Sequence, residues 1–226
     1  MPVLYGTGWK GGAVLAAFFL SSNLISRILR PQPPGALDSK GDRRDAPQVY
    51  ANGAVAALGG AVGLLDAGLG LWLVTASLAA AAADTWATTV GCWSGVPPRL
   101  LWSGRVVPVG TSGGITAAGT AGAAIGALFV AGTGAAASGM LILLPAGTLI
   151  GFLGMVADST LGALAQGRFR CPVCNAASEW RVHGCGAATR RESGLEWLNN
   201  DGVNFLATAS AAGAALAMWY WLSPPP

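Results

Sequence analysis

The sequence contains few charged residues. Only 10% of its 226 residues are Asp, Glu, Lys or Arg, whereas 53% are hydrophobic, and the mean hydropathy is +0.53. A soluble domain needs a polar surface, so this shortage of charge excludes one and indicates a polytopic membrane protein. The net charge of +3 is too small and too dispersed for a nucleic-acid surface, and we expect no nucleic-acid partner. Internal repeats are also lacking, which favours a single domain over residues 1–226.

Long apolar stretches supply the predicted membrane spans, since about 20 apolar residues cross the hydrocarbon layer. The first stretch could instead be a signal peptide because it follows Lys10, but residues 21–27 form no small-residue cleavage pattern. We therefore predict an all-α polytopic membrane bundle of about six transmembrane helices. The expected spans are 11–29, 48–66, 68–92, 114–133, 137–166 and 202–222.

Basic residues flank these spans asymmetrically. Apart from Lys10, all lysines and arginines fall in the loops after the first, third and fifth spans. Cytoplasmic loops carry the excess of Lys and Arg, so these three loops are predicted to be cytoplasmic and both termini to lie outside. The composition, rich in Ala and Gly, and the lack of an organelle presequence favour a prokaryotic inner membrane. The loop 31–47 is rich in Pro, Gly and charge, and it is either a solvated connector or a lid.

Three acidic residues lie within or beside apolar stretches, where an ionised group is costly without a partner or a function. They are Asp84, Asp158 and Asp201, and the predicted topology places all three near the cytoplasmic ends of their spans, as it does Asn52. The first two could each pair with an arginine, and Asp201 could be a helix N-cap. Together they favour a Mg²⁺ site, since this cation binds through one or two carboxylates and substrate phosphates.

A glycine-rich run precedes the fourth span: Gly110, Thr111, Ser112, Gly113 and Gly114. Backbone N–H groups exposed before a helix form an anion site. Arg105 lies close by in sequence, and its guanidinium matches phosphate oxygens. The alternative is a flexible turn that ends in a Ser or Thr N-cap.

Three of the four cysteines and the single histidine occupy one loop, at Cys171, Cys174, His183 and Cys185. Three thiolates and an imidazole form a closed tetrahedral zinc site, and in the cytosol a Cys-x-x-Cys pair binds metal more often than it forms a disulfide. The alternative is a redox pair or free thiols. A closed site has no position for substrate, so zinc would staple the cytoplasmic insertion 168–196 without performing chemistry. Cys92 is interpreted as a packing residue, and Trp180 as a membrane-interface anchor.

Six short segments in order along the chain resemble the integral-membrane family that includes plant phytyl-phosphate kinase and transmembrane protein 19. The segments are residues 20–24, 48–53, 83–88, 110–114, the Cys/His loop and 197–204. This resemblance implies transfer of a phosphoryl group from a nucleoside triphosphate, preferably CTP, to an isoprenoid monophosphate such as phytyl or geranylgeranyl phosphate. One position departs from the family pattern: Thr89 stands where an acid follows the Asp-Thr-Trp-Ala-Thr run.

The residues can be given roles on this hypothesis of a membrane-embedded lipid-phosphate kinase. Asp84, Asp158 and Asp201 would hold Mg²⁺, and residues 110–114 with Arg105 would cradle the phosphates. The substrate-orienting residues would be Asn52, Asn200 and Asn204, and the prenyl tail would lie between helices. A transporter or flippase for lipid phosphates or ions is the alternative, but such proteins bind near the bilayer midplane, between repeats. A zinc-stabilised scaffold would leave the intramembrane acids unexplained.

Overall fold

The computed structural model describes residues 1–29 and 46–222, so most of the loop 31–47 lies outside the described residues. The helices are α1 (Pro2–Ile28), α2 (Ala46–Val62), α3 (Ala67–Trp93), α4 (Ala117–Ser138), α5 (Leu143–Leu164) and α6 (Asn200–Leu222). All except α2 are long and apolar enough to cross a membrane. With 17 residues, α2 extends over about 26 Å, slightly less than the hydrocarbon thickness. The predicted polytopic helical membrane bundle is confirmed.

Several helix boundaries differ from the expected spans, and two of these differences involve local features of the chain. Helix α1 begins at Pro2 rather than at residue 11, and Gly8 bends it with a φ of 61°, a conformation open to glycine. Helix α2 ends at Val62 rather than at residue 66, because Asp66 serves as the N-cap of α3. Its Oδ1 accepts from the N–H groups of Gly68 at 2.9 Å and Leu69 at 3.0 Å.

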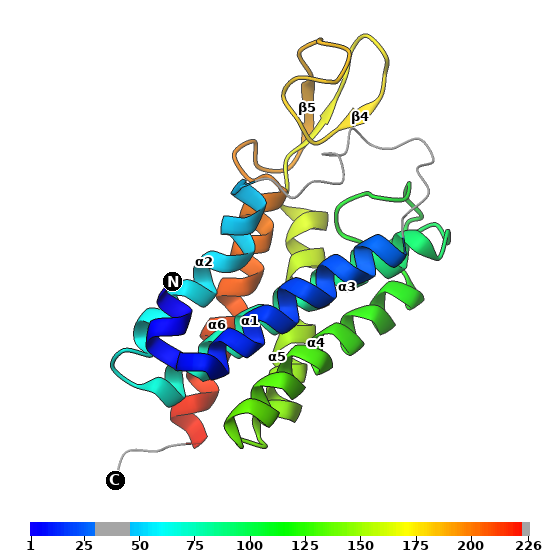
Figure 1. Cartoon of the computed structure of the whole chain (residues 1–226). Helices are drawn as coiled ribbons and strands as arrows, with labels where there is room; N and C mark the ends of the chain where they lie inside the picture. The colour runs from blue at the N-terminus through cyan, green and yellow to red at the C-terminus, as the bar shows by residue number, and fades with distance from the viewer. Residues whose placement is uncertain (30–45, 223–226) are drawn as a thin grey trace.

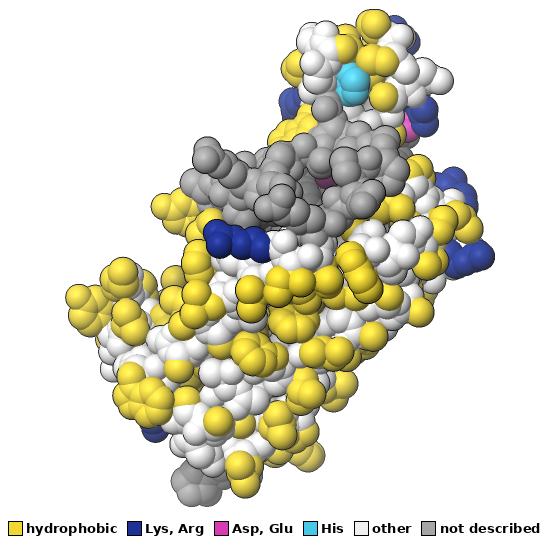
Figure 2. Space-filling view, turned by 45° about the vertical axis from the view of Figure 1, so that its right-hand side comes forward, with side chains coloured by type: hydrophobic (Ala, Val, Ile, Leu, Met, Phe, Trp, Pro, Cys, Tyr) yellow, Lys and Arg dark blue, Asp and Glu magenta, His cyan; other side chains and the backbone are white. Residues whose placement is uncertain are grey.

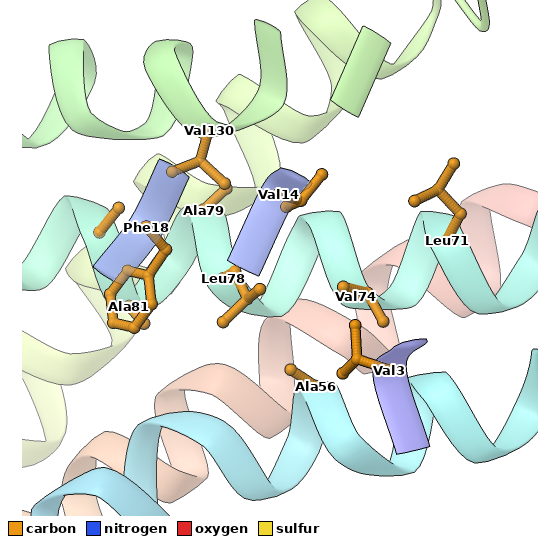
Figure 3. Packing of buried hydrophobic residues seen from close by; sticks show 11 residues of the cluster. Val3, Val14, Phe18, Ala56, Leu71, Val74, Leu78, Ala79, Ala81 and Val130 are labelled. Carbon is orange, nitrogen blue, oxygen red and sulfur yellow. The ribbon is translucent and has the colours of Figure 1, made fainter. Parts of the chain in front are cut away.

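Helix α3 forms the centre of the bundle and contacts all five other helices (Figure 1). Small residues let it do so, because they allow helix backbones to approach closely. A Cβ atom added at Gly151 of α5 would lie only 2.8 Å from the Cβ of Ala79 in α3. Larger side chains fill the space around α1, where Val14, Phe18 and Leu78 pack in one buried cluster (Figure 3).

Short strands form two small sheets in the loops, which an all-α prediction does not contain. Strands β1 (Arg99–Leu100) and β2 (Gly114–Ile115) pair antiparallel between α3 and α4. Strands β3 (Arg168–Arg170), β4 (Ala177–Ser178) and β5 (Arg190–Ser193) form an antiparallel sheet in the order β4-β3-β5. This second sheet belongs to the segment 168–196, which we call the Cys/His module, and it projects from one end of the bundle (Figure 1).

Charge and apolar surface are separated along the molecule. Hydrophobic side chains cover most of the lower body in Figure 2, whereas lysine and arginine side chains gather at the upper end and on the Cys/His module. One basic side chain is visible at the lower left. The upper end is therefore the polar end of the bundle.

Candidate functional site

A cavity of about 440 Å³ opens at the polar end of the bundle. Every helix contributes to it. Consecutive helices alternate in direction, so the lining residues come from the C-terminal ends of α1, α3 and α5 and from the N-terminal ends of α2, α4 and α6. The contributing residues include Ser26 of α1, Asn52 of α2, Asp84 of α3, Thr120 of α4, Asp158 of α5 and Asn204 of α6. Polar residues up to 178 positions apart in sequence therefore line the same cavity.

Asp158 is the most deeply buried acid of the cavity. Its side chain is 7% exposed, and its Oδ2 atom makes no hydrogen bond to any residue in the described part of the chain. Asp84 lies near enough for the two carboxylates to repel one another electrostatically. A buried carboxylate oxygen without a partner is costly, and a bound cation would remove both the repulsion and that cost.

Asp201 also lines the cavity, near the first turn of α6. It is the second residue of α6, so its position inside the helix is not that of the N-cap we considered. Asn199 performs that role instead, since its Oδ1 accepts from the N–H of Gly202 at 2.9 Å. The predicted substrate-orienting residues Asn200 and Asn204 lie beside it in the cavity wall, and Asn204 is buried.

The predicted glycine-rich run, residues 110–114, forms part of the wall and is closely braced. The Ser112 hydroxyl donates to Oε1 of Gln166 at 2.5 Å, and the Thr111 hydroxyl donates to the Pro108 carbonyl at 2.7 Å. Gly113 has a φ of 78°, and a Cβ atom there would lie 2.4 Å from the backbone nitrogen of Ala163. The run is therefore a fixed loop seated on the end of α5. Thr116, just beyond it, is the N-cap of α4.

Arg105 is not brought to this site. It is exposed in the β1–β2 connection and is not among the described residues that line the cavity. A different arginine braces the glycine loop: Nη2 of Arg168 donates to the carbonyl oxygens of Ser112 at 3.3 Å, Gly162 at 3.1 Å and Ala163 at 3.2 Å. Arg168 thus joins the loop to the C-terminal end of α5.

Two lining residues come from the Cys/His module and were not predicted as site residues. They are Glu179 and Trp180, which follow β4 directly. Burial raises the pKa of the Glu179 carboxyl, while the Arg168 guanidinium and a hydrogen bond from the Gln166 side chain act in the opposite direction. Trp180, which we predicted to be a membrane-interface anchor, lies in the cavity wall. Neither residue carries a sequence signal of its own, because both lie in a polar loop outside the spans.

Four acids therefore line the cavity: Asp84, Asp158, Glu179 and Asp201. No lysine or arginine is among the lining residues of the described ranges 1–29 and 46–222. These carboxylates do not form a preassembled cluster of three metal ligands. One or two carboxylates plus phosphate oxygens suffice to bind Mg²⁺, so these acids could hold the cation together with a phosphate substrate.

Thr89 also lines the cavity, at the position where the family pattern has an acid. Its side chain is buried, and its hydroxyl oxygen lies 3.4 Å from that of Ser26. The contact joins α1 to α3 at the wall of the cavity. A hydroxyl pair in this place supplies hydrogen-bonding capacity without adding a further negative charge.

The Cys/His module brings together the four predicted zinc ligands, which could bind a metal such as zinc. Their ligand atoms all lie within 4.8 Å of one another. The sulfur–sulfur distances are 3.5 Å for Cys171–Cys174, 3.6 Å for Cys171–Cys185 and 3.3 Å for Cys174–Cys185, and His183 Nδ1 lies 3.3 Å from the Cys174 sulfur. A tetrahedron with zinc–sulfur bonds of 2.3 Å has edges of about 3.8 Å, close to this spacing.

The thiol pKa values in the module reflect this crowding. Hydrogen bonds with Cys185 and Cys171 raise the pKa of Cys174 to about 12, whereas the contact with His183 lowers the pKa of Cys185 to about 6. Three thiolates this close repel one another, so protons remain on some of them in the absence of a cation. A divalent metal would relieve that repulsion and bind all three as thiolates.

A second groove adjoins the cavity on the membrane-spanning surface. It has a volume of about 660 Å³, and it shares Ile115, Thr116 and Thr120 with the cavity wall. Its other lining residues are Arg99, Ala117, Ala121, Ala124 and Phe152. Apart from Arg99 near the polar end, the walls that it does not share are apolar, so the groove places an apolar surface of α4 and α5 beside the acid-lined cavity.

Comparison with known proteins gives relatives across most of the chain. The chain is 28% identical over 238 residues to Protein PGR of Arabidopsis thaliana, covering 91% of this chain and 80% of the relative. It is 32% identical over 165 residues to an uncharacterised membrane protein of Methanocaldococcus jannaschii, covering 73% of this chain and 68% of that protein. No solved structure matches it. The family described as integral membrane protein DUF92 matches residues 1–212, and the chain belongs to this family.

Proposed function

We propose that this protein is a membrane-embedded lipid-phosphate kinase. It transfers the γ-phosphoryl group of a nucleoside triphosphate, CTP in the first instance, to an isoprenoid monophosphate such as phytyl or geranylgeranyl phosphate. The observation that supports the proposal most strongly is the meeting of Asp84, Asp158 and Asp201 with the glycine loop in one cavity at the polar end of the bundle. Phosphoryl transfer depends on positioning and charge neutralisation, which these groups are suited to provide.

Mg²⁺ fits the carboxylates of the cavity, because the unpartnered Oδ2 of Asp158 and its repulsion with Asp84 both favour a cation. When bound, the ion would neutralise the developing charge on the phosphoryl oxygens. Asp84 and Asp158 would hold it, and Asp201 would contribute from the other side of the cavity. Arg105, which is exposed and outside the lining, has no role in this proposal.

The reaction itself needs no general base. An ionised oxygen of the lipid phosphate attacks the γ-phosphorus of CTP, a new phosphorus–oxygen bond forms, and the bond to the β-bridging oxygen breaks. CDP leaves with that electron pair. The N–H groups of Gly110, Ser112 and Gly113 would cradle phosphate oxygens, whereas those of Thr111 and Gly114 donate within the loop, to the carbonyl groups of Pro108 and Thr111. Asn52, Asn200 and Asn204 would orient the phosphates in line.

The groove between α4 and α5 is suited to the isoprenoid chain. It continues the cavity wall through Ile115, Thr116 and Thr120, and beyond them its lining is small and apolar at Ala121 and Ala124. The chain would lie along the lipid-facing side of the bundle while its phosphate enters the cavity. The hydrocarbon then stays in the membrane throughout the reaction, so no cost of transferring it to water arises.

The orientation follows from the distribution of basic residues. The cavity lies at the end of the bundle where the Arg-rich Cys/His module projects, and excess Lys and Arg marks the cytoplasmic side. We therefore propose that the cavity opens to the cytoplasm of a prokaryotic cell, where CTP is available, and that both termini lie outside. A structural zinc ion in the Cys/His module completes the proposal.

Asp158→Asn and Asp84→Asn test the proposal in purified protein. With [γ-³²P]CTP, Mg²⁺ and geranylgeranyl phosphate in detergent, the wild type should form labelled diphosphate. Each variant should lose about 100-fold or more in kcat/KM, because charge stabilisation in the transition state is lost. Asp66→Asn is the matched control: this acid caps α3 away from the cavity. Full activity in both cavity variants would rule out the metal site.

Reconstituted vesicles separate the enzyme from the carrier. Wild-type protein in proteoliposomes with CTP and geranylgeranyl phosphate should convert the lipid on the CTP side only. Movement of unmodified lipid phosphate across the bilayer, with no diphosphate formed, would replace the kinase by a flippase.

A further inference from the structure

The Cys/His module reaches the cavity of the bundle through Glu179. We infer that the module forms a wall of the cavity that is needed for its shape. Within it, Glu179 is a positioning residue that fixes the glycine loop through Gln166. This deepens the proposed function, on which the kinetic part of its test rests. It also extends the expected role of the metal. Besides stabilising the fold of the insertion, the metal would keep Glu179 in position in the cavity wall.

The first support is a chain of side-chain contacts from the module to the loop. The Ser112 hydroxyl donates to Oε1 of Gln166 at 2.5 Å, and the Gln166 side chain lies close enough to Glu179 to lower the pKa of its carboxyl. The Gln166 side chain is only 2% exposed, so water does not readily replace either partner. A carboxylate can only accept hydrogen bonds, so Glu179 favours the amide orientation in which the NH₂ group faces Glu179 and the oxygen faces Ser112.

The second support is Arg168, which lies between the same elements. Its guanidinium donates to the carbonyl oxygen of Ser112 and interacts electrostatically with Glu179. The glycine loop is therefore held at Ser112 by both its hydroxyl and its carbonyl group. Both attachments lead to Glu179, one through Gln166 and the other through Arg168.

The third support is the position of Glu179 relative to the predicted metal site. Strands β3 and β4 pair with Phe169 opposite Ser178, and Glu179 comes next along the chain. Cys171 follows β3 directly, and its backbone N–H donates to Ala176 at 2.8 Å. Cys171 and Cys174 thus lie in the turn between β3 and β4, and Glu179 directly follows β4. Loss of the metal would therefore loosen this hairpin and move Glu179 away from the cavity.

Other acids of the module provide matched comparisons. Glu192 pairs with Arg170, and Glu196 lies 3.4 Å from Arg181, in both cases at the exposed surface. Neither is among the described residues that line the cavity. Glu196→Ala removes a carboxylate from the same module without touching the chain from Ser112 to Glu179, and it is the control for Glu179→Ala.

Cys92 provides a readout of the cavity that does not depend on catalysis. It lines the cavity and is half-buried, and in zinc-loaded protein it is the one cysteine of the four outside the metal site. N-ethylmaleimide labelling, with peptide mass spectrometry to quantify Cys92, measures how well the wall closes. We expect Glu179→Ala to speed this labelling several-fold, and Glu196→Ala to match the wild type. Glu179→Gln, which keeps an acceptor oxygen, should restore most of the protection.

Kinetics and zinc content complete the test. Glu179→Ala should lower kcat/KM for transfer by about 10–100-fold, the range typical of residues that orient groups of a site, with zinc stoichiometry and melting temperature unchanged. If Cys92 labelling is the same in Glu179→Ala, Glu196→Ala and wild type, the inference is overturned. Loss of zinc in Glu179→Ala would also overturn it, since the residue would then serve the module's own fold. An inactive wild type would refute the kinase and leave the labelling result decisive for the wall.

Discussion

The membrane bundle and the Cys/His module are held together by different physical means. The bundle packs small residues, so that Ala79, Ala82 and Ala83 of α3 are completely buried against neighbouring helices. The module has three short strands and little core, chiefly Phe169 and Cys171. Chains that cannot bury enough apolar surface need metals or disulfides. We therefore expect loss of a metal ligand to unfold the module alone and overpacking to destabilise the bundle alone. The cavity should be affected in both cases, because both regions line it.

Replacing a metal ligand should break the module and spare the bundle. We expect Cys171→Ser to lose zinc and abolish transfer while helix content remains, because structural zinc in small domains contributes about 10–16 kcal/mol of apparent binding free energy. Metal analysis and circular dichroism in detergent measure the two effects. Cys92→Ser, at a cysteine outside the metal site, should retain one zinc per chain. Zinc retention in Cys171→Ser would remove this residue from the ligand set.

Overpacking the bundle should give the converse result. A Cβ atom at Gly151 would lie 2.8 Å from the Ala79 side chain, so we expect Gly151→Ala to destabilise the protein by about 1–3 kcal/mol with its zinc intact. Gly132→Ala is the matched control, because its nearest neighbour would be a Leu144 methyl group at 3.5 Å. Thermal unfolding followed by circular dichroism compares the two. Equal melting temperatures would contradict close packing at Gly151.

The glycine loop, where the two regions meet, sharpens the comparison further. Gly110 and Gly113 both have positive φ, at 86° and 78°, and alanine at either position costs about 1–2 kcal/mol of backbone strain. Only at Gly113 would the new Cβ atom also meet the backbone of Ala163, at 2.4 Å. Gly113→Ala should therefore reduce transfer far more than Gly110→Ala. Similar rates in the two variants would show that seating the loop on α5 is unimportant.

Much of the fold could be predicted from the sequence because its signals are local. Apolar stretches and the scarcity of charge predicted the helices of a membrane protein, and the Cys171-x-x-Cys174 and His183-x-Cys185 spacing predicted a metal-binding set. The start of α1 was missed, because residues 2–10 combine Lys10 with Gly6, Thr7 and Gly8 and lack a continuous apolar run. Burial of α1 against Val74 and Leu78 is a tertiary effect.

The candidate site was predictable only in part. Asp84 and Asp158 stood out because acids are rare in spans, and the structure does bring them together with Asp201 and the glycine loop. Arg105 and Glu179 show the limit of this reasoning. Closeness in sequence favoured Arg105, which is exposed, whereas Glu179 reaches the cavity from a polar loop outside the predicted spans.

The sequence by itself determined the class of the molecule, a helical membrane protein with a Cys/His cluster that could bind a metal, because hydropathy and ligand spacing are properties of short segments. Only the tertiary structure decided which charges share the cavity. Helix directions, strand pairing between β3 and β4, and the hydrogen bonds of Gln166 bring together residues from distant segments. Side chains meet according to how whole elements pack, and that packing is set by contacts throughout the bundle rather than by any one motif.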